Sequence, residues 1–191
     1  MTAAPGVVVM GTGRSGTSLV AGLLAAHGVF FGRCKPGDQH NPRGYWEHVS
    51  IASPGIIPGD WPERWPGILR SDGWDGVSPW GVKHMAGRWR YFRRLAPAVI
   101  LLTARPVADV VASIRRTGWD MDPAHVVRLY RRRLRRIRRE ARCPIITVST
   151  PALVAGRSQE FAAVLSLLGL AYRPELAREW IDPRVWHGRT A

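Results

Sequence analysis

The feature that most constrains the fold is a strand, a glycine-rich loop and a helix that follow one another near the start of the chain. Residues 6–10 (GVVVM) are short, β-branched and apolar throughout, which is typical of a strand buried on both faces of a parallel sheet. The loop GTGRSGTS (residues 11–18) follows directly, and LVAGLLAAHG then predicts a helix of two to three turns closed by Gly28. In this setting the backbone N–H groups of a glycine loop can converge on an anion at the N-terminus of a helix.

Strand-like and helix-like segments alternate along the rest of the chain. We predict strands at residues 78–83, 98–104 and 144–150, helices at 86–96, 106–118, 126–142 and 160–170, and an irregular end over the final twenty residues. The alternation predicts an α/β fold: a three-layer, P-loop-like domain with a central parallel sheet flanked by helices. In such sheets the ligand binds at the carboxyl ends of the strands.

The length of 191 residues predicts one domain, residues 1–191, with an irregular, Trp-rich insertion at about 32–80. A long irregular segment inside a compact domain is more often functional than a linker. Its aromatic rings predict either an apolar pocket for a ligand or ordinary core packing. The tryptophans concerned are Trp46, Trp61, Trp65, Trp74 and Trp80.

The chain is strongly basic, with 28 lysine and arginine residues against 14 aspartate and glutamate residues and a net charge of +14. Such a charge favours polyanionic partners, although its bias toward arginine is equally typical of a GC-rich genome. The densest basic segment, residues 126–142, also carries an apolar stripe at helical spacing. It lacks an aromatic stacking platform, a zinc site or a helix-turn-helix pattern, so we interpret it as a solvated helix face that attracts anions, with nucleic acid an unlikely partner.

Composition also predicts a location. The apolar runs at residues 7–10 and 97–102 fall far short of the ~20 residues that cross a bilayer, and the chain starts without a secretory pattern. We therefore expect a soluble protein with no membrane span. Two cysteines, Cys34 and Cys143, form neither a disulfide framework nor a zinc set, which favours the reducing cytoplasm.

The glycine loop differs from the ATPase pattern GxxxxGK[ST] at its most important position. It keeps Gly11 and Gly16 but has Thr17 where the lysine belongs, and Arg14 supplies the positive charge instead. A guanidinium fork suits a planar set of anionic oxygens. The loop therefore predicts an anionic ligand other than an ordinary nucleoside triphosphate; a plain turn with a solvated Arg14 is the alternative.

Three motifs together resemble the bacterial type of the sulfotransferases that use 3′-phosphoadenosine 5′-phosphosulfate (PAPS). They are the loop GTGRSGTS, NPRGYWE at residues 41–47 and RPVADVVAS at residues 105–113. The resemblance implies PAPS as co-substrate, with its 5′-phosphosulfate on the loop and its 3′-phosphate on an arginine and a serine eight residues apart. The loop residues are Gly13, Arg14, Ser15, Gly16, Thr17 and Ser18, and the other two are Arg105 and Ser113.

Two of these residues have structural alternatives. Ser113 could be an ordinary solvated or back-bonded helix serine, and Arg105 could form a surface ion pair with Asp109 four residues on. The proposed pairing of the loop with Arg105 and Ser113 requires that both places face one site, no further apart than an adenosine can span.

Sulfuryl transfer needs groups that position the anion, neutralise its charge and remove a proton from the acceptor. By resemblance, the base is Glu47 of NPRGYWE or His84 after the strand, with His48 as a third choice. The family spacing Lys-x-His is Lys-His here, so His84 points the other way from its counterpart. Lys83 and Arg14 would stabilise the transferred group or the leaving phosphate. The acceptor would be a hydroxyl or amine of a small molecule or glycan.

The sequence shows no cluster of carboxylates or of His and Cys residues suited to a metal, and the chemistry needs none in principle, so we expect activity in the presence of EDTA. Two other functions stay open. One is a P-loop nucleotide kinase or phosphotransferase, against which Thr17 and the lack of an acidic magnesium ligand at a strand end both argue. The other is a non-catalytic domain that binds anions or nucleic acid.

Overall fold

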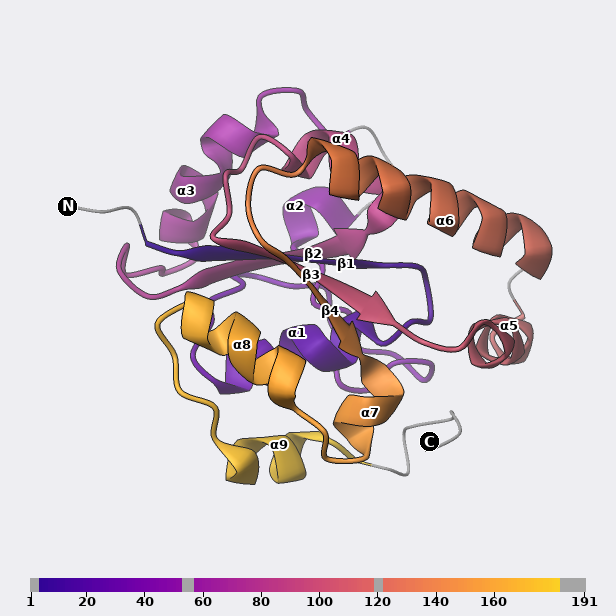
Figure 1. Cartoon of the computed structure of the whole chain (residues 1–191). Helices are drawn as coiled ribbons and strands as arrows, with labels where there is room; N and C mark the ends of the chain where they lie inside the picture. Colours follow the sequence, from indigo (N-terminus) through magenta and orange to yellow (C-terminus); the bar gives the residue numbers. More distant parts are fainter. Residues whose placement is uncertain (1–3, 53–56, 119–121, 183–191) are drawn as a thin grey trace.

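A parallel sheet in the strand order β2-β1-β3-β4 forms the centre of the computed structural model, which describes residues 4–52, 57–118 and 122–182 (Figure 1). The strands are β1 (Gly6–Gly11), β2 (Trp80–Met85), β3 (Val99–Ala104) and β4 (Ile145–Ser149). All three neighbouring pairs are parallel, and β1 lies between β2 and β3. The predicted α/β class with a central parallel sheet flanked by helices is confirmed.

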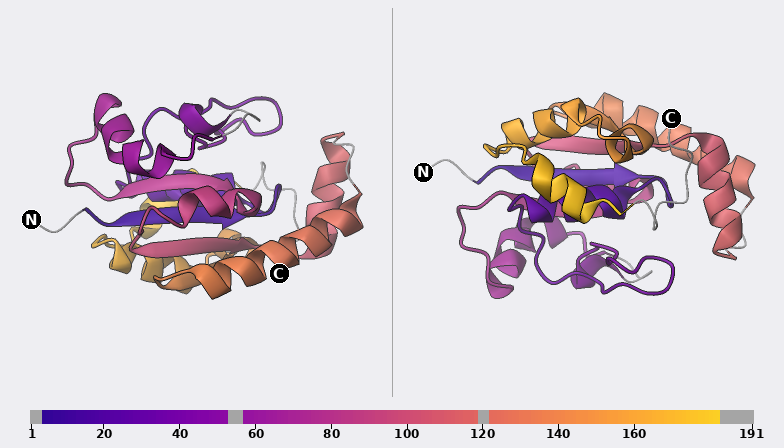
Figure 2. Two further views of the ribbon diagram at one scale, coloured as in Figure 1. Left: turned by 90° about the horizontal axis from the view of Figure 1, so that it is seen from above. Right: turned by 90° about the horizontal axis from the view of Figure 1, so that it is seen from below.

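Helices cover both faces of this sheet, as Figure 1 shows in the view along its plane. One layer contains α1, α7, α8 and α9, the other contains α2, α3, α4 and α6, and α5 lies beyond the carboxyl ends of the strands (Figures 1 and 2). The helices are α1 (Thr17–Ala26), α2 (Val49–Ala52), α3 (Trp61–Ser71), the 3-10 turn η1 (Ala86–Arg88), α4 (Trp89–Phe92), α5 (Val107–Arg116), α6 (Pro123–Glu140), α7 (Thr150–Val154), α8 (Gln159–Leu167) and α9 (Pro174–Trp180).

Alternate residues of the strands supply two separate cores. Val7, Val9 and Leu101 pack on the side of α1, α8 and α9. Val8 and Met10, one residue away along the same strand, pack on the side of α3, α4 and α6. Because successive side chains of a strand point to opposite faces, a one-residue step along β1 or β2 moves a side chain from one core to the other.

Three of the five tryptophans named in the insertion belong to the core. Trp61, Trp65 and Trp80 are at most 9% exposed and pack over the sheet with the second set of strand residues. The insertion is also less irregular than its composition suggested, because it contains the three-turn helix α3, which begins with a proline at its second residue. Of the two predicted roles for the tryptophans, the structure supports core packing, and not a ligand pocket, for these three rings.

Two helix predictions need correction. The predicted helix at residues 86–96 is shorter, because η1 and α4 end at Phe92 and Ala96 adopts a left-handed backbone with φ of 47°. The final twenty residues are not irregular throughout: α9 begins at Pro174, a favoured first position, and Trp180 at its end packs against α1. Residues 183–191 lie outside the described part of the chain.

The basic helix α6 buries one stripe and exposes the other. Ile137 is fully buried and the Tyr130 hydroxyl donates to the backbone O of Thr103 at 2.9 Å. Glu140 forms ion pairs with Arg93, Arg136 and Arg139. The other face is a row of exposed arginines, namely Arg128, Arg131, Arg132, Arg135, Arg136, Arg138 and Arg139.

The contact between α1 and α9 generates a prediction about Gly22. A Cβ at Gly22 would lie 1.9 Å from the Trp180 ring, so Gly22→Ala should displace α9 and lower the free energy of unfolding by about 1–3 kcal/mol, as overpacking does. Chemical denaturation of the two proteins measures the difference.

The matched control is Gly67→Ala in α3, where a Cβ would meet nothing within 4 Å. That substitution should leave stability unchanged or raise it by about 0.5–1 kcal/mol, the usual gain of alanine over glycine in a helix. A Gly22→Ala protein as stable as the Gly67→Ala protein would show that α9 does not pack as described.

Candidate functional site

The turn between β1 and α1 adopts the backbone that the glycine loop predicts. Gly16 has a φ of 89° and precedes the first residue of α1, and Arg14 has a φ of 67°, which is uncommon for a residue with a side chain. A Cβ at Gly16 would lie 2.6 Å from the Thr150 side chain, so glycine is needed there for space as well as for conformation.

Two hydroxyl groups, one from β3 and one from α7, hold this turn on its buried side. The Ser15 hydroxyl lies 2.6 Å from the Thr103 hydroxyl and donates to the backbone O of Thr12 at 2.8 Å. The Thr150 hydroxyl lies 3.1 Å from both the backbone O of Ser15 and that of Ala104. Ser15 is 1% exposed, so its side chain faces into the domain and braces the loop; the sequence prediction had assigned its hydroxyl to the ligand.

The structure brings Arg14, Arg105 and Ser113 together. Arg14 Nε donates to Ser113 Oγ at 3.0 Å across 99 residues of sequence, and Arg105 Nη1 donates to the backbone O of Arg14 at 3.0 Å. Arg105 follows β3, and Ser113 is a buried residue of α5. The two places that the sequence treated as separate anion sites therefore face one another and are directly hydrogen-bonded.

These groups line one cavity of about 420 Å³ at the carboxyl ends of the strands. Of the predicted site residues it contains Gly13, Arg14, Gly16, Thr17, Ser18, Glu47, Lys83, Arg105 and Ser113. Ser15 and His84 do not line it. Among the described residues of its wall, five are cationic and two are carboxylates: Arg14, Lys35, Arg43, Lys83 and Arg105 against Glu47 and Asp182.

Glu47 and Lys83 form a buried ion pair in the wall of this cavity. The Lys83 ammonium lies 3.0 Å from Glu47 Oε1, and the two side chains are 5% and 15% exposed. Burial lowers the pKa of Lys83, and the neighbouring Glu47 carboxylate acts in the opposite direction. The pair thus keeps a cation and a proton acceptor side by side with little water around them.

His84 lies one residue further along β2 and so on the opposite face of the sheet. Its Nδ1 accepts from the backbone N–H of Met85 at 2.8 Å, its Nε2 lies 3.2 Å from the backbone O of Ile51, and its ring packs near Phe92. Burial lowers the pKa of His84, and both ring nitrogens are engaged. Lys83 and His84 are adjacent in β2, so their side chains point to opposite faces of the sheet. Lys83 therefore points to the cavity, and His84 points to the core on the other face.

His48, the third candidate base, does not line the cavity either. It is 3% exposed, and its Nε2 lies 2.6 Å from Asp72 Oδ2. Both histidines therefore point into the core. The residues immediately before them in the sequence, Lys83 and Glu47, face the cavity.

The arginines of the site are only partly hydrated. Burial lowers the pKa of both Arg14 and Arg105, and the charge of nearby Arg116 adds to the effect in each case. A guanidinium in this environment remains charged, and an anion that enters the cavity replaces the lost hydration. The electrostatics of the site therefore favour an anionic ligand.

The outer wall of the cavity comes from Lys35, from residues of the NPRGYWE segment and from Trp180. Tyr45 donates to Asp38 at 2.7 Å, and its ring carries the Lys35 ammonium 4.5 Å from its centre. Arg43 stacks on Trp180 at 4.9 Å. The aromatic partners hold both cations without neutralising them. The NPRGYWE motif indicated this part of the wall from the sequence. The contribution of Trp180 could not be predicted from the residues around it, because it depends on how α9 packs against α1.

Fold and site together define an α/β protein with a glycine-rich turn between its first strand and its first helix, in which Arg14 and Gly16 adopt left-handed backbone. The structure is similar to the sulfotransferase domain from the curacin biosynthetic pathway, with a TM-score of 0.57 and 15% sequence identity over 92% of this chain and 77% of that one. The similarity shows a shared fold, as the loop and the Arg105/Ser113 step led us to expect. Comparison with protein-family models found no match, and comparison with curated proteins found none either.

Two further observations concern the described residues as a whole. None of their helices combines the length and the apolar character that crossing a membrane requires. Within the same residues, no group of three or more His, Cys, Asp and Glu side chains is placed to hold a metal ion.

Cys34 and Cys143 are free thiols, and burial raises the pKa of Cys34 to about 12.

The buried ion pair generates a stability prediction. Glu47→Gln leaves the Lys83 ammonium without its carboxylate and should lower the free energy of unfolding by about 2–4 kcal/mol, and adding Lys83→Met should recover most of the loss because no charge then stays buried. Urea unfolding of the wild type, both single variants and the double variant gives the coupling energy.

An exposed ion pair provides the control. Arg64 and Asp60 lie 3.9 Å apart with side chains more than 60% exposed, so Arg64→Gln should change stability by less than about 0.5 kcal/mol. A double variant no more stable than Glu47→Gln alone would contradict the assignment of the loss to an unpaired Lys83.

Proposed function

We propose that the chain is a sulfotransferase that moves the sulfuryl group of PAPS to a hydroxyl or amine of a small molecule or glycan. The observation that carries the proposal is the meeting of Arg14, Arg105 and Ser113 at one cavity, although they come from three separate segments. A ligand with two anionic ends suits a site that offers a phosphate-binding turn and, beside it, an arginine and a serine.

In this proposal the turn binds the 5′ end of the nucleotide. The backbone N–H groups of residues 13–18 and the N-terminus of α1 attract the phosphosulfate, and the Arg14 guanidinium neutralises its charge. Arg105 and Ser113 bind the 3′-phosphate. Because Arg14 already contacts Ser113, its side chain connects the two ends and would stabilise both.

The size and charge of the cavity support this ligand class. About 420 Å³ lies within the range of roughly 300–1,000 Å³ typical of small-molecule sites. The excess of cations over carboxylates in the wall suits a multiply charged nucleotide. Thr17, in place of the lysine of ATPase loops, favours a nucleotide other than a nucleoside triphosphate.

Glu47 and Lys83 would perform the transfer step. Glu47 Oε1 is held by Lys83, which leaves Oε2 to take the proton from the acceptor hydroxyl or amine. The acceptor atom then forms a bond to sulfur as the bond from sulfur to the phosphate oxygen breaks in line, and adenosine 3′,5′-bisphosphate leaves. The Lys83 ammonium and Arg14 stabilise the negative charge that develops on the leaving oxygen.

The nucleotide assignment predicts which ligands stabilise the protein. Adenosine 3′,5′-bisphosphate should raise the midpoint of thermal unfolding more than adenosine 5′-monophosphate or ATP with Mg²⁺ at equal concentration, because it alone places phosphates on both sites. Ser113→Ala and Arg105→Ala should weaken the bisphosphate by about 10- to 100-fold, since each removes a hydrogen bond to a charged group.

The same two variants should change the affinity for adenosine 5′-monophosphate by less than about threefold, because they influence its 5′-phosphate only through their hydrogen bonds to Arg14. Arg157→Ala, which removes an exposed arginine, serves as the control and should leave both affinities unchanged. Equal losses for both nucleotides would remove the assignment of Arg105 and Ser113 to the 3′-phosphate, and stronger stabilisation by ATP with Mg²⁺ would favour a phosphotransferase.

The base assignment predicts a rate effect without a binding effect. Glu47→Gln should lower the rate of sulfuryl transfer from ³⁵S-labelled PAPS to a panel of phenols, amines and sugars by about 10²- to 10⁴-fold, as expected for loss of a general base. Affinity for adenosine 3′,5′-bisphosphate should stay within about threefold, because Glu47 does not contact the nucleotide in this account. His84→Gln is the comparison, and a larger rate loss there than for Glu47→Gln would overturn the assignment.

A further inference from the structure

Glu47 belongs to an extended segment that pairs with residues 33–35. The Lys35 N–H donates to the backbone O of Glu47 at 2.8 Å, and the Val49 N–H donates to the backbone O of Arg33 at 2.9 Å. In extended backbone, successive side chains point to opposite sides. Glu47 accordingly points to Lys83 in the cavity wall, whereas His48 points away from the cavity toward α3.

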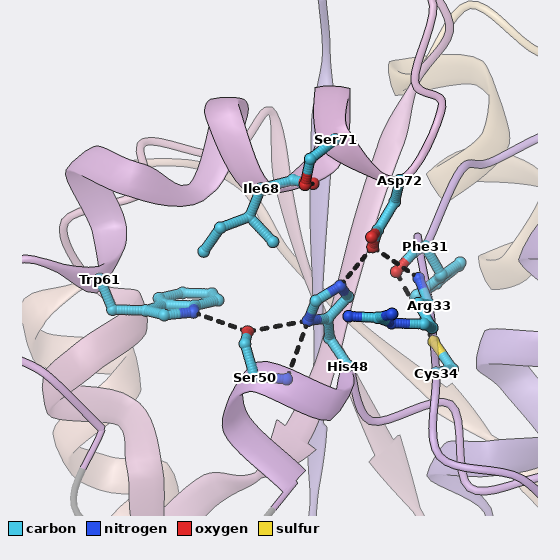
Figure 3. A network of polar contacts seen from close by, with 9 residues as sticks. All are labelled: Phe31, Arg33, Cys34, His48, Ser50, Trp61, Ile68, Ser71 and Asp72. Carbon is cyan, nitrogen blue, oxygen red and sulfur yellow. Dashed lines mark hydrogen bonds and ion pairs between the residues drawn. The ribbon is translucent and has the colours of Figure 1, made fainter.

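His48 is anchored at both ring nitrogens, as Figure 3 shows. Its Nδ1 accepts from the backbone N–H of Ser50 at 3.2 Å, so the proton of the neutral ring lies on Nε2, which donates to Asp72 Oδ2 at 2.6 Å. The ring is 3% exposed and meets the Trp65 ring edge to face at 5.1 Å. The Ser50 hydroxyl lies 2.8 Å from Nδ1 and accepts from Trp61 Nε1 at 3.2 Å.

Asp72 ties both sides of the paired segment to the end of α3. The same oxygen that accepts from His48 also accepts from the backbone N–H of Arg33 at 2.8 Å. These hydrogen bonds keep the pKa of Asp72 below its usual value despite its burial. The Asp72 carboxylate packs closely against the backbone of Gly32, because a Cβ at Gly32 would lie only 2.6 Å from that carboxylate oxygen. The carboxylate therefore has little room to move.

The residue on the other side of Glu47 adopts an unfavourable backbone. Trp46 has a φ of 59°, a left-handed conformation that a residue with a bulky side chain rarely adopts. Such a conformation persists where the surrounding contacts determine it. Here the Trp46 ring packs against Phe31 and Trp180, and its Nε1 donates to the backbone O of Arg43 at 3.1 Å.

We propose that His48 and Asp72 are positioning residues that hold the carboxylate of Glu47 against Lys83. Without their hydrogen bond, the segment that follows Trp46 can rotate toward a relaxed backbone, and because the side chains alternate, that rotation withdraws Glu47 from the cavity wall. We call the hydrogen-bonded pair of His48 and Asp72 the clamp. Its geometry is independent of the activity, whereas its consequence for catalysis rests on the proposed function.

The composition of the chain allows a direct test. Lys35 and Lys83 are its only lysines, so protein labelled with ¹⁵N at the lysine side chains gives two ammonium signals in a proton-nitrogen correlation spectrum, and Lys35→Arg assigns them. Glu47→Gln defines the position of the Lys83 signal when its carboxylate partner is lost. The measured quantity is how far each clamp variant moves the signal toward that reference position.

Asp72→Ala and His48→Asn should move the Lys83 signal at least halfway to the reference, because the first removes the acceptor of the Nε2 proton and the second is too short to reach Asp72. His48→Gln should keep the signal within a quarter of that distance, since its amide nitrogen can replace Nε2. An unmoved signal in either Asp72→Ala or His48→Asn, or an equal displacement in His48→Gln, would overturn the proposal. If one of these two variants fails to fold, the other still decides between these outcomes.

The catalytic consequence is measured separately. His48→Asn and Asp72→Ala should lower kcat for sulfuryl transfer at least tenfold while the Kd for adenosine 3′,5′-bisphosphate changes less than twofold, and His48→Gln should restore most of the rate. An equal loss of nucleotide affinity would show a general structural role instead. A wild-type protein that does not bind the bisphosphate would contradict the proposed function alone, because the lysine spectra still test the clamp.

Discussion

The hydrogen bonds that join the glycine loop to the ends of β3 and β4 determine the geometry of the whole site. Thr103 and Thr150 hold the backbone and side chain of Ser15, and this fixes the left-handed turn on which Arg14 projects. Arg105 then binds the backbone of Arg14, so the second arginine is placed by the loop itself. A site held in this way spends little free energy on ordering when an anion binds, which is the advantage of preorganisation.

A second constraint comes from the alternation of side chains along extended backbone. In β2 it sends Lys83 to the cavity and His84 to the opposite core, and in the segment before α2 it sends Glu47 to the cavity and His48 to α3. In both places a titratable group at the cavity has a buried histidine as its neighbour. The histidines make hydrogen bonds inside the protein, and the charged residues beside them form the ion pair that the proposed chemistry uses.

The order of the strands could be predicted from the sequence because short apolar runs such as residues 6–10 are typical of strands buried in a parallel sheet. The glycine loop and the step from Arg105 to Ser113 pointed to one end of that sheet, and the structure places them together there. Sequence could not reveal that Ser15 faces inward, because this depends on Thr103 and Thr150 from distant segments. For the same reason it left open whether the tryptophans of the insertion pack in the core, and it missed α9, whose Trp180 completes the cavity wall.

In the proposed function, one nucleotide is held at both of its anionic ends inside this cavity. A crystal structure of the protein with adenosine 3′,5′-bisphosphate tests it most directly. We expect the 5′-phosphate on the backbone of residues 13–18 and the 3′-phosphate within hydrogen-bonding distance of Arg105 and Ser113. A nucleotide bound elsewhere, or one with its 3′-phosphate turned away from Arg105 and Ser113 into solvent, would contradict it.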